Sequence, residues 1–356
     1  MKKIGFILIL IFVALSTSNT FAEIKKSREK DMGGYQIEAG EVFYRFAYPM
    51  NVVINFPIKL ENSDLASFKI LSDSHSKDKN QVYFRHRSLP GAHPITFKIR
   101  GQFYGVDHTN VYYYWRVVIG ADVGSFKALA FEYGQDKNHH YFNELVIADV
   151  DNKSFVPLSD YHSKDKNQVY YKTKVIFKAD PKTFQSLNAA YGKDQNFVYL
   201  ETSQIPEADP ETFSFLGGRH SKDQKQVYYE KSALLLNLRN TILLNSDYIK
   251  DDNQVYRQGR VISGADSRTF VLLDKIGWYS KDKNKVYYLG RPVLGDPATF
   301  ESIKGSYGKD KDTIYYQGKV VVGADQKTFR TVSNPQLDAL DKDYMYKEGK
   351  KIEQSD

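Results

Sequence analysis

Short apolar runs alternate with polar turns at a fixed interval along most of this chain. The clearest run, Val-Tyr-Tyr at 169–171, follows the polar stretch Ser-Lys-Asp-Lys-Asn-Gln at 163–168. Runs of this length are too short for an amphipathic helix, and Val and Tyr both favour strands. The pattern therefore predicts short β-strands joined by tight turns.

An aspartate in the polar stretch recurs every 28 to 31 residues, most often every 29. Its ten copies are Asp78, Asp107, Asp136, Asp165, Asp194, Asp223, Asp251, Asp282, Asp310 and Asp341. A fixed period of this size is typical of a tandem array of one supersecondary unit. A repeat this short cannot bury its own apolar face, so neighbouring repeats must stack.

Tyrosine stands five positions after this aspartate in every copy, whereas the residue that follows the tyrosine varies. Side chains on a strand alternate between faces, so the constant Tyr and its variable neighbour point in opposite directions. We expect the constant Tyr, such as Tyr170, to face the core. Its hydroxyl should bond a buried partner, such as the backbone of the next repeat. The variable neighbour should face a more solvated side.

The turns between the apolar runs have recognisable chemistry. Asp and Asn stabilise tight turns, so the Lys-Asp-Lys-Asn segment predicts a turn between two strands. Glycine in a later turn, as at Gly259 and Gly318, predicts a hairpin leading to a third strand. The segment Asp-Pro-Lys-Thr-Phe at 180–184 predicts one capped helical turn, with Asp as the N-cap and Pro at the first helical position.

These elements predict an all-β fold: a tandem array of about ten 29-residue repeats. Each repeat is expected to hold three short antiparallel strands and one capped helical turn. We favour an open superhelical, solenoid-like array. The alternative is a closed propeller-like ring, although propeller blades usually have four strands and about 40 residues or more.

The start of the chain differs from the rest. Lys2 and Lys3 precede an apolar run at 4–15 and a tail of small and polar residues ending at Ala22, which predicts a signal peptide over 1–22. An uncleaved anchor is the alternative, but the run is shorter than the about 20 residues a spanning helix needs. Residues 23–71 are expected to form an atypical capping unit, and 72–356 the repeats. No transmembrane span is expected after cleavage, and the mature protein should be periplasmic or extracellular.

Composition narrows the function. The absence of cysteine excludes disulfides, thiolate metal sites and a lipid-modified cysteine. The formal charge of +7 is spread evenly among acidic residues, which argues against a nucleic-acid groove. The chain has 27 tyrosines and 22 phenylalanines, a composition that favours strands.

The sequence Asp-Lys-Asn-Gln-Val-Tyr-Tyr at 165–171 resembles the signature of the DKNYY repeat family of bacterial exported proteins. The resemblance covers roughly residues 69–356, because the motif recurs in phase. It supports the repeat architecture. It implies no established activity, cofactor or catalytic residue.

Candidate chemistry in the repeats is weak. Asp-x-Asn resembles the start of a calcium loop, but no Glu closes it at a fixed distance, so turn chemistry is favoured. His75, His162 and His220 share one position in their repeats and are expected to be surface turn residues; a shared metal site would require ring closure. No nucleophile elbow, phosphate loop or zinc-protease helix is present. We therefore expect no catalytic, metal or cofactor residue, and no enzyme.

The sequence predicts a non-enzymatic exported protein that serves as a protein-binding or structural module of the cell envelope. One alternative is a module that binds cell-wall polysaccharide through exposed aromatic side chains, which stack on sugars. A hydrolase is the remaining alternative. The candidate contact residues are Trp115, Tyr113, Tyr171, Tyr229, Tyr288, Tyr316 and Trp278.

Overall fold

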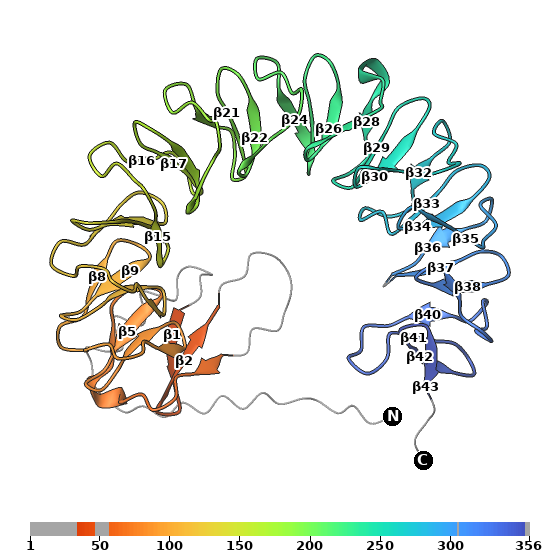
Figure 1. Ribbon diagram of the computed structural model, residues 1–356. Helices are drawn as coiled ribbons and strands as arrows, with labels where there is room; N and C mark the ends of the chain where they lie inside the picture. Colours follow the sequence, from red (N-terminus) through yellow and green to blue (C-terminus); the bar gives the residue numbers. More distant parts are fainter. Residues whose placement is uncertain (1–33, 47–56, 305, 353–356) are drawn as a thin grey trace. The chain divides into compact units, whose positions relative to one another are not determined.

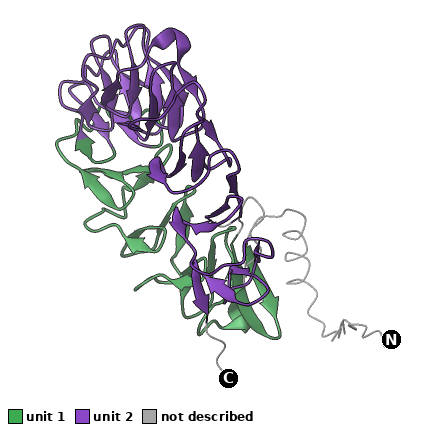
Figure 2. Ribbon diagram, turned by 90° about the vertical axis from the view of Figure 1, so that its right-hand side faces the viewer, with its two compact units in different colours: residues 1–160, 172–174 green, residues 161–171, 175–356 purple. Residues whose placement is uncertain are grey.

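A computed structural model describes residues 34–46, 57–304 and 306–352. The chain divides into two compact units (Figure 2). The first unit holds residues 1–160 and 172–174, and the second holds 161–171 and 175–356. Within each unit, small antiparallel sheets follow one another in chain order (Figure 1).

The elements up to residue 160 are β1 (Gly34–Glu38), β2 (Glu41–Arg45), β3 (Ile58–Lys59), the 3₁₀ helix η2 (Leu65–Ser67), β4 (Lys69–Ile70), β5 (His75–Lys77), β6 (Val82–Phe84), β7 (Arg87–Ser88), β8 (Lys98–Arg100), β9 (Tyr104–Val106), β10 (Val111–Tyr113), β11 (Arg116–Val117), β12 (Lys127–Ala128), β13 (Tyr133–Gln135), β14 (His140–Phe142), β15 (Leu145–Ile147) and β16 (Val156–Pro157).

The later elements are β17 (His162–Lys164), β18 (Val169–Tyr171), β19 (Lys174–Val175), β20 (Gln185–Ser186), β21 (Tyr191–Lys193), β22 (Val198–Leu200), β23 (Ser203–Gln204), β24 (Ser214–Gly217), β25 (His220–Lys222), β26 (Val227–Tyr229), β27 (Ser232–Leu234), the 3₁₀ helix η3 (Leu238–Asn240), β28 (Ile242–Leu243), β29 (Tyr248–Lys250), β30 (Val255–Arg257), β31 (Arg260–Val261), β32 (Val271–Leu272), β33 (Tyr279–Lys281), β34 (Val286–Tyr288), β35 (Arg291–Val293), β36 (Glu301–Ser302), β37 (Tyr307–Lys309), β38 (Ile314–Tyr316), β39 (Lys319–Val320), β40 (Arg330–Thr331), β41 (Ala339–Leu340), β42 (Met345–Lys347) and β43 (Lys350–Ile352).

Each repeat is a four-stranded antiparallel sheet in chain order, as in β20-β21-β22-β23. The central hairpin holds the signature motif, with Lys193 paired to Val198 across the turn. The all-β tandem-repeat fold is therefore confirmed. The expected three strands per repeat was wrong, because a two-residue strand such as Gln185–Ser186 follows the capped turn and is too short to show a period. The choice between an open array and a closed ring stays a prediction.

The predicted capped turn is present. The Asp180 carboxylate accepts the backbone N–H of Lys182 and the hydroxyl of Thr183, at 3.0 and 2.8 Å. The N–H of Phe184 closes the turn on the Asp180 carbonyl at 3.0 Å. The Phe184 ring then lies over the next strand, where a Cβ added at Gly192 would stand 2.2 Å from its Cζ. Only glycine allows this close approach between the turn and the sheet.

The beginning of the chain has a different sheet. Strands β1, β2 and β3 form a sheet of three strands instead of four, and Val42 and Leu60 are fully buried beside it. The predicted signal peptide lies outside the described residues, and the domain boundaries stay a prediction. No helix in the described part of the chain has the length and apolarity needed to cross a bilayer.

Candidate binding surface

The aspartate of the signature motif is the centre of a buried hydrogen-bond network. In the repeat of Asp194, one carboxylate oxygen accepts the backbone N–H groups of Asn196 and Phe197, both at 2.8 Å. The other accepts the hydroxyl of Tyr199 at 2.8 Å and the backbone N–H of Asp180 at 2.9 Å. One side chain thus joins the turn, the following strand and the preceding capped turn. Protein donors occupy both oxygens, which supports the turn interpretation over a calcium ligand.

The same pairing recurs along the chain. The hydroxyl of the constant Tyr donates to the aspartate of its own repeat, whereas we expected a partner in the backbone of the next repeat. The nine pairs are Tyr83–Asp78, Tyr112–Asp107, Tyr141–Asp136, Tyr170–Asp165, Tyr199–Asp194, Tyr228–Asp223, Tyr287–Asp282, Tyr315–Asp310 and Tyr346–Asp341. In the tenth, Tyr256 donates to Gln254 instead. Burial raises the pKa of Asp107, but N–H donors from His93, Asn110 and Thr109 outweigh it and lower the pKa to about 2. The Asp107 carboxylate is therefore held ionised.

A second tyrosine series makes the contact between repeats. It stands three positions before the aspartate. Several of its hydroxyls donate to backbone carbonyls one repeat further on, whereas Tyr307 donates to the Asp338 carboxylate at 2.7 Å. Tyr104 donates to Asn143 at 2.7 Å, and Tyr248 donates to Gly277 at 2.9 Å. The regular spacing of these tyrosines is visible in the sequence, but the sequence analysis did not predict that they make contacts between repeats.

The three in-phase histidines occupy this same stacking position. His75, His162 and His220 are 1%, 0% and 0% exposed, so their expected placement on the surface was wrong. Each ring takes the place of the stacking Tyr and packs against aromatic neighbours, as His162 does against Phe184 at 5.5 Å. Burial lowers the pKa of His75 and His162 to about 4. Among the described residues, no three His, Asp or Glu side chains lie together as metal ligands would.

Two of the predicted contact residues are buried. Tyr113 and Tyr171 are 5% and 8% exposed, so their expected exposure was wrong. The hairpin strand is covered on both faces: the Tyr113 ring packs on Tyr104 at 5.3 Å, and the Tyr171 ring packs on His162 at 5.4 Å. The ring on the paired strand of the same repeat therefore covers the neighbour of the constant Tyr as well.

The remaining predicted contact residues are half-buried: Trp115, Tyr229, Tyr288, Tyr316 and Trp278. Tyr288 and Tyr316 each cover the hairpin of the following repeat, where a Cβ added at Gly318 or Gly349 would stand 2.9 or 2.6 Å from the tyrosine Cβ. These residues lie at successive contacts between repeats rather than in one common site. Their role in binding stays a prediction.

Five of the six most exposed large apolar side chains in the described part of the chain stand at one fixed position, twelve residues after the motif aspartate; the sixth is Ile95. The five are Ile119 at 83%, Phe177 at 72%, Leu235 at 81%, Leu294 at 77% and Val322 at 81% exposed. We call these five residues the apolar turn row. The residue just before each is nearly always buried, as with Val118 at 2% and Ile176 at 1%.

Turn chemistry does not require a large apolar residue there. In most repeats the row position is followed by a residue with positive φ, as at Gly120 (φ 79°) and Lys178 (φ 64°), which is typical of a type II turn. Leu235 is an exception, because Leu236 is not among the residues with positive φ. Such a turn favours Pro before the positive-φ residue, and Pro90 and Pro206 fill the row position in two other repeats. Ile, Phe, Leu and Val therefore serve neither the turn nor the core. Sequence reasoning missed the row because each residue extends an apolar run, as in Val-Val-Val at 320–322.

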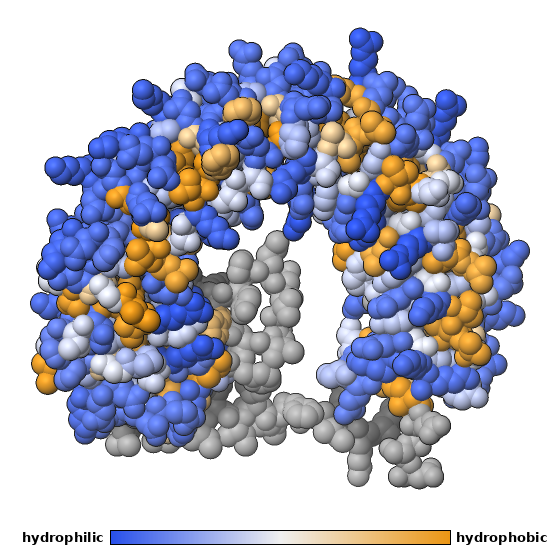
Figure 3. Space-filling model, viewed as in Figure 1, coloured by the Kyte–Doolittle hydropathy of each residue, from blue (hydrophilic) through white to orange (hydrophobic). Residues whose placement is uncertain are grey.

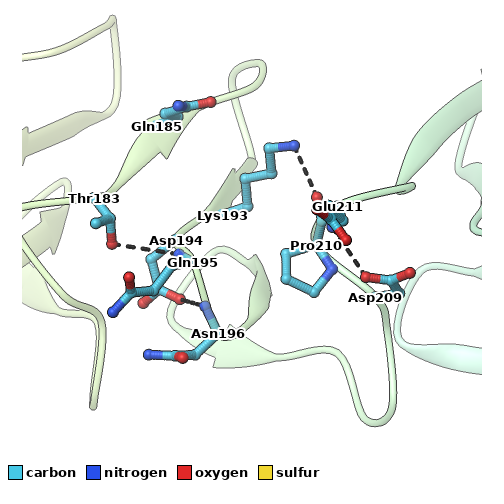
Figure 4. A pocket seen from close by; sticks show the side chains of 9 residues that line it. All are labelled: Thr183, Gln185, Lys193, Asp194, Gln195, Asn196, Asp209, Pro210 and Glu211. Atoms are coloured by element: carbon cyan, nitrogen blue, oxygen red, sulfur yellow. Dashed lines mark hydrogen bonds between the residues drawn. The ribbon is translucent and has the colours of Figure 1, made fainter.

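A polar groove lies between neighbouring repeats of the second unit (Figure 4). Its volume is about 620 Å³, and its lining comprises Thr183, Gln185, Lys193, Asp194, Gln195, Asn196, Asp209, Pro210 and Glu211. Its charged groups are largely engaged by the fold. Lys193 donates to the carbonyl of Pro210 at 2.8 Å, and the Asp209 carboxylate accepts the backbone N–H of Glu211 at 3.0 Å. The groove is best explained as a product of stacking.

Repeated four-stranded sheets, nearly all organised around a buried Asp–Tyr pair, define an all-β tandem repeat protein. The model of the DKNYY family matches residues 11–114, 103–233, 162–291 and 295–350. The chain therefore belongs to the DKNYY family. No curated protein and no solved structure matches it.

Proposed function

We propose that this repeat protein is exported and acts, without catalysis, as a binding module of the cell envelope that docks another envelope protein along the apolar turn row. The signal-like pattern of residues 1–22 supports export. The observation that carries the docking role is the row itself: large apolar side chains more than 70% exposed at one position of the repeat.

The exposure of the row is unusual because the surface around it is mainly hydrophilic. The face shown in Figure 3 is mainly hydrophilic, with hydrophobic residues in separate groups. Single exposed apolar residues are ordinary on protein surfaces, but a set that recurs with the repeat is not scattered. Covering one Leu or Phe side chain contributes about 1.5–3 kcal/mol. Four of the row residues, Phe177, Leu235, Leu294 and Val322, belong to the second unit. Contacts linked within one unit act together, so individually weak contacts suffice for stable binding.

The carboxylates favour a non-catalytic role. A hydrolase needs a pair of carboxyl groups that face a substrate with pKa values tuned to different tasks. Here the motif aspartates are buried, and each binds the backbone of a turn that lies 14 to 16 residues earlier in the chain. The Asp310 carboxylate, for example, accepts the backbone N–H of Asp296 at 3.0 Å. Burial raises the pKa of Asp310, but the hydrogen bonds from the backbone N–H groups of Asp296 and Asp312 outweigh it and lower the pKa below its ordinary value. Such groups serve as fixed acceptors rather than as acids.

Site-specific photo-crosslinking tests the docking role. A benzophenone amino acid is placed at Leu235 or Leu294 in the row, and at Ile276, which is 62% exposed but outside it. We expect one and the same protein adduct from both row positions in cells that produce the protein, and no such adduct from Ile276. Adducts of equal yield from all three positions, or none from the row, would contradict the proposal.

A further inference from the structure

Two neighbouring hairpins in the first unit differ from the others. The β6–β7 turn is Arg85-His86 and the β10–β11 turn is Tyr114-Trp115. Four of the other repeats have polar residues without glycine in the same turn, and the last four close it with glycine, at Gly259, Gly290, Gly318 and Gly349. The Tyr114 and Trp115 rings pack on Phe84 of the preceding repeat, with centroids 4.8 and 5.9 Å apart, so these two turns meet through aromatic rings.

Tyr114 and Trp115 form an aromatic cluster against which arginine side chains pack. The guanidinium carbons of Arg87 and Arg116 lie 4.9 and 5.5 Å from the centre of the Trp115 ring. Tyr114 stacks on the same ring, with centroids 6.1 Å apart and an angle of 18°. Cation–π contacts of this kind fix the plane of a guanidinium group while its N–H edge remains free to bind an anion.

A third arginine joins the cluster from the side. The guanidinium of Arg85 lies 5.2 Å from the Phe84 ring and 5.4 Å from the Phe46 ring. Arg116 pairs with Glu144, but Arg85 and Arg87 form no ion pair within the described residues. Burial lowers the pKa of His86, and Arg87 and Arg85 lower it further, which reflects the positive charge gathered here.

The basic character of one position extends beyond this cluster. Nine residues after the motif aspartate, seven of the ten repeats carry an exposed Arg or Lys: Arg87, Arg116, Lys174, Arg260, Arg291, Lys319 and Lys350. Outside the cluster, Arg260, Arg291 and Lys319 also form no ion pair with the described carboxylates. A cation repeated with the period of the array suits a linear polymer whose negative charges repeat as well.

We propose that Arg85, Arg87 and Arg116 bind an anionic glycopolymer through its phosphate or carboxylate groups. Guanidinium groups recognise both oxyanions through paired N–H donors. Trp115 is a positioning residue for Arg87 and Arg116, because it orients their guanidinium groups rather than contacting the charge. The Phe84 and Phe46 rings hold Arg85 in the same way. This site is independent of the apolar turn row and of the proposed protein partner.

Sedimentation of the purified protein with two polymers tests the site, since poly(glycerol phosphate) offers phosphate and polygalacturonate offers carboxylate. We expect Arg87→Gln/Arg116→Gln to weaken binding to at least one of them by about tenfold or more, since each hydrogen bond to a charged group contributes substantially. The control, Lys225→Gln/Lys285→Gln, removes the same charge from exposed turns and should stay within about twofold of wild type. Trp115→Phe should retain binding and Trp115→Ala should lose part of it, with the melting temperature measured for each variant.

The outcomes separate the sources of the anion. Binding to one polymer alone identifies phosphate or carboxylate as the recognised group, and supports the site in either case. Three results would overturn it: no binding to either polymer, equal weakening by the arginine pair and the lysine control, or equal binding to duplex DNA. The last two would indicate unspecific attraction of a basic protein to any polyanion.

Discussion

The hydroxyl of Tyr287 donates a hydrogen bond to the buried carboxylate of Asp282 over 2.8 Å. The same carboxylate oxygen accepts the backbone N–H of Asp266 at 2.8 Å, so one atom joins the central strand to the preceding capped turn. Because this arrangement recurs through the array, the residues that define the repeat are those that stack it. The residues available for binding are those that the network leaves out.

Asp282→Asn should destabilise the protein by about 2–3 kcal/mol, because an amide group cannot accept every donor that the carboxylate satisfies. Urea unfolding followed by circular dichroism measures the shift of the midpoint. The matched control is Asp312→Asn on an exposed turn, which should change the midpoint little. Equal shifts for the two variants would show that the network is not a source of stability.

Tyr287→Ala should lower the free energy of unfolding by about 3–5 kcal/mol, because a fully buried aromatic side chain is removed. Tyr288→Ala should cost less, since Tyr288 is only half-buried. Urea midpoints of the two variants compare the faces of one strand directly. Small and equal losses would contradict the assignment of the constant Tyr to the core.

Gly318→Ala should be more destabilising than Gly120→Ala. Both glycines have positive φ, 76° and 79°, so the backbone strain of an alanine is similar at the two positions. At Gly318 the added Cβ would also stand 2.6 Å from Val293 and 2.9 Å from Tyr288, whereas nothing lies within 4 Å at Gly120. The difference between their melting temperatures measures how closely the repeats stack, and no difference would contradict the contact.

Stability should fall as the pH is lowered from 6.5 towards 4, before the carboxylates titrate. Burial lowers the pKa of His75 and His162 to about 4, so below pH 6.5 the unfolded chain binds protons that the folded protein excludes. Each such histidine corresponds to about 3 kcal/mol, present above pH 6.5 and lost by pH 4. The melting temperature as a function of pH measures this loss.

The matched variant replaces His75, His162 and His220 by Phe, which keeps a ring but cannot be protonated. Its melting temperature should stay nearly constant between pH 6.5 and about 5. A second loss should begin near pH 5 and grow below pH 4, because the unfolded chain then binds protons on carboxylates such as Asp107, whose pKa is lowered to about 2 in the folded protein. An unchanged slope between pH 6.5 and 4 would mean that other groups carry the dependence.

The period of the motif aspartates was sufficient to predict an all-β repeat array, the capped turn at Asp180 and the buried constant Tyr. It could not show strands of two residues such as Gln185–Ser186, because alternation needs more positions to be visible. It also placed His75 on the surface, since a polar residue beside Lys-Asp suggests a turn. Only the stack of repeats shows that this position takes a ring that packs between strands.

The sequence named Trp115 as a candidate contact residue, and its role in binding stays a prediction. Its neighbours Arg87 and Arg116 were not predicted, because they come from two hairpins and meet only through stacking. The apolar turn row was hidden because Phe177 follows the buried Ile176 and reads as part of one apolar run. The structure distinguishes the two residues, because Ile176 is buried and Phe177 is exposed. Which of them is exposed depends on the type of turn that ends the strand.

Retention of the protein by the cell envelope tests the central claim most directly. The row variant carries Ser at Phe177, Leu235, Leu294 and Val322. The control variant carries Ser at four exposed apolar residues outside the row: Ile95, Leu145, Ile242 and Ile276. The measurement is the fraction of protein that stays with the envelope after a high-salt wash, which weakens charge-based attachment. We predict that the row variant keeps the wild-type melting temperature but is released, while the control is retained; equal retention of the two variants would contradict the account.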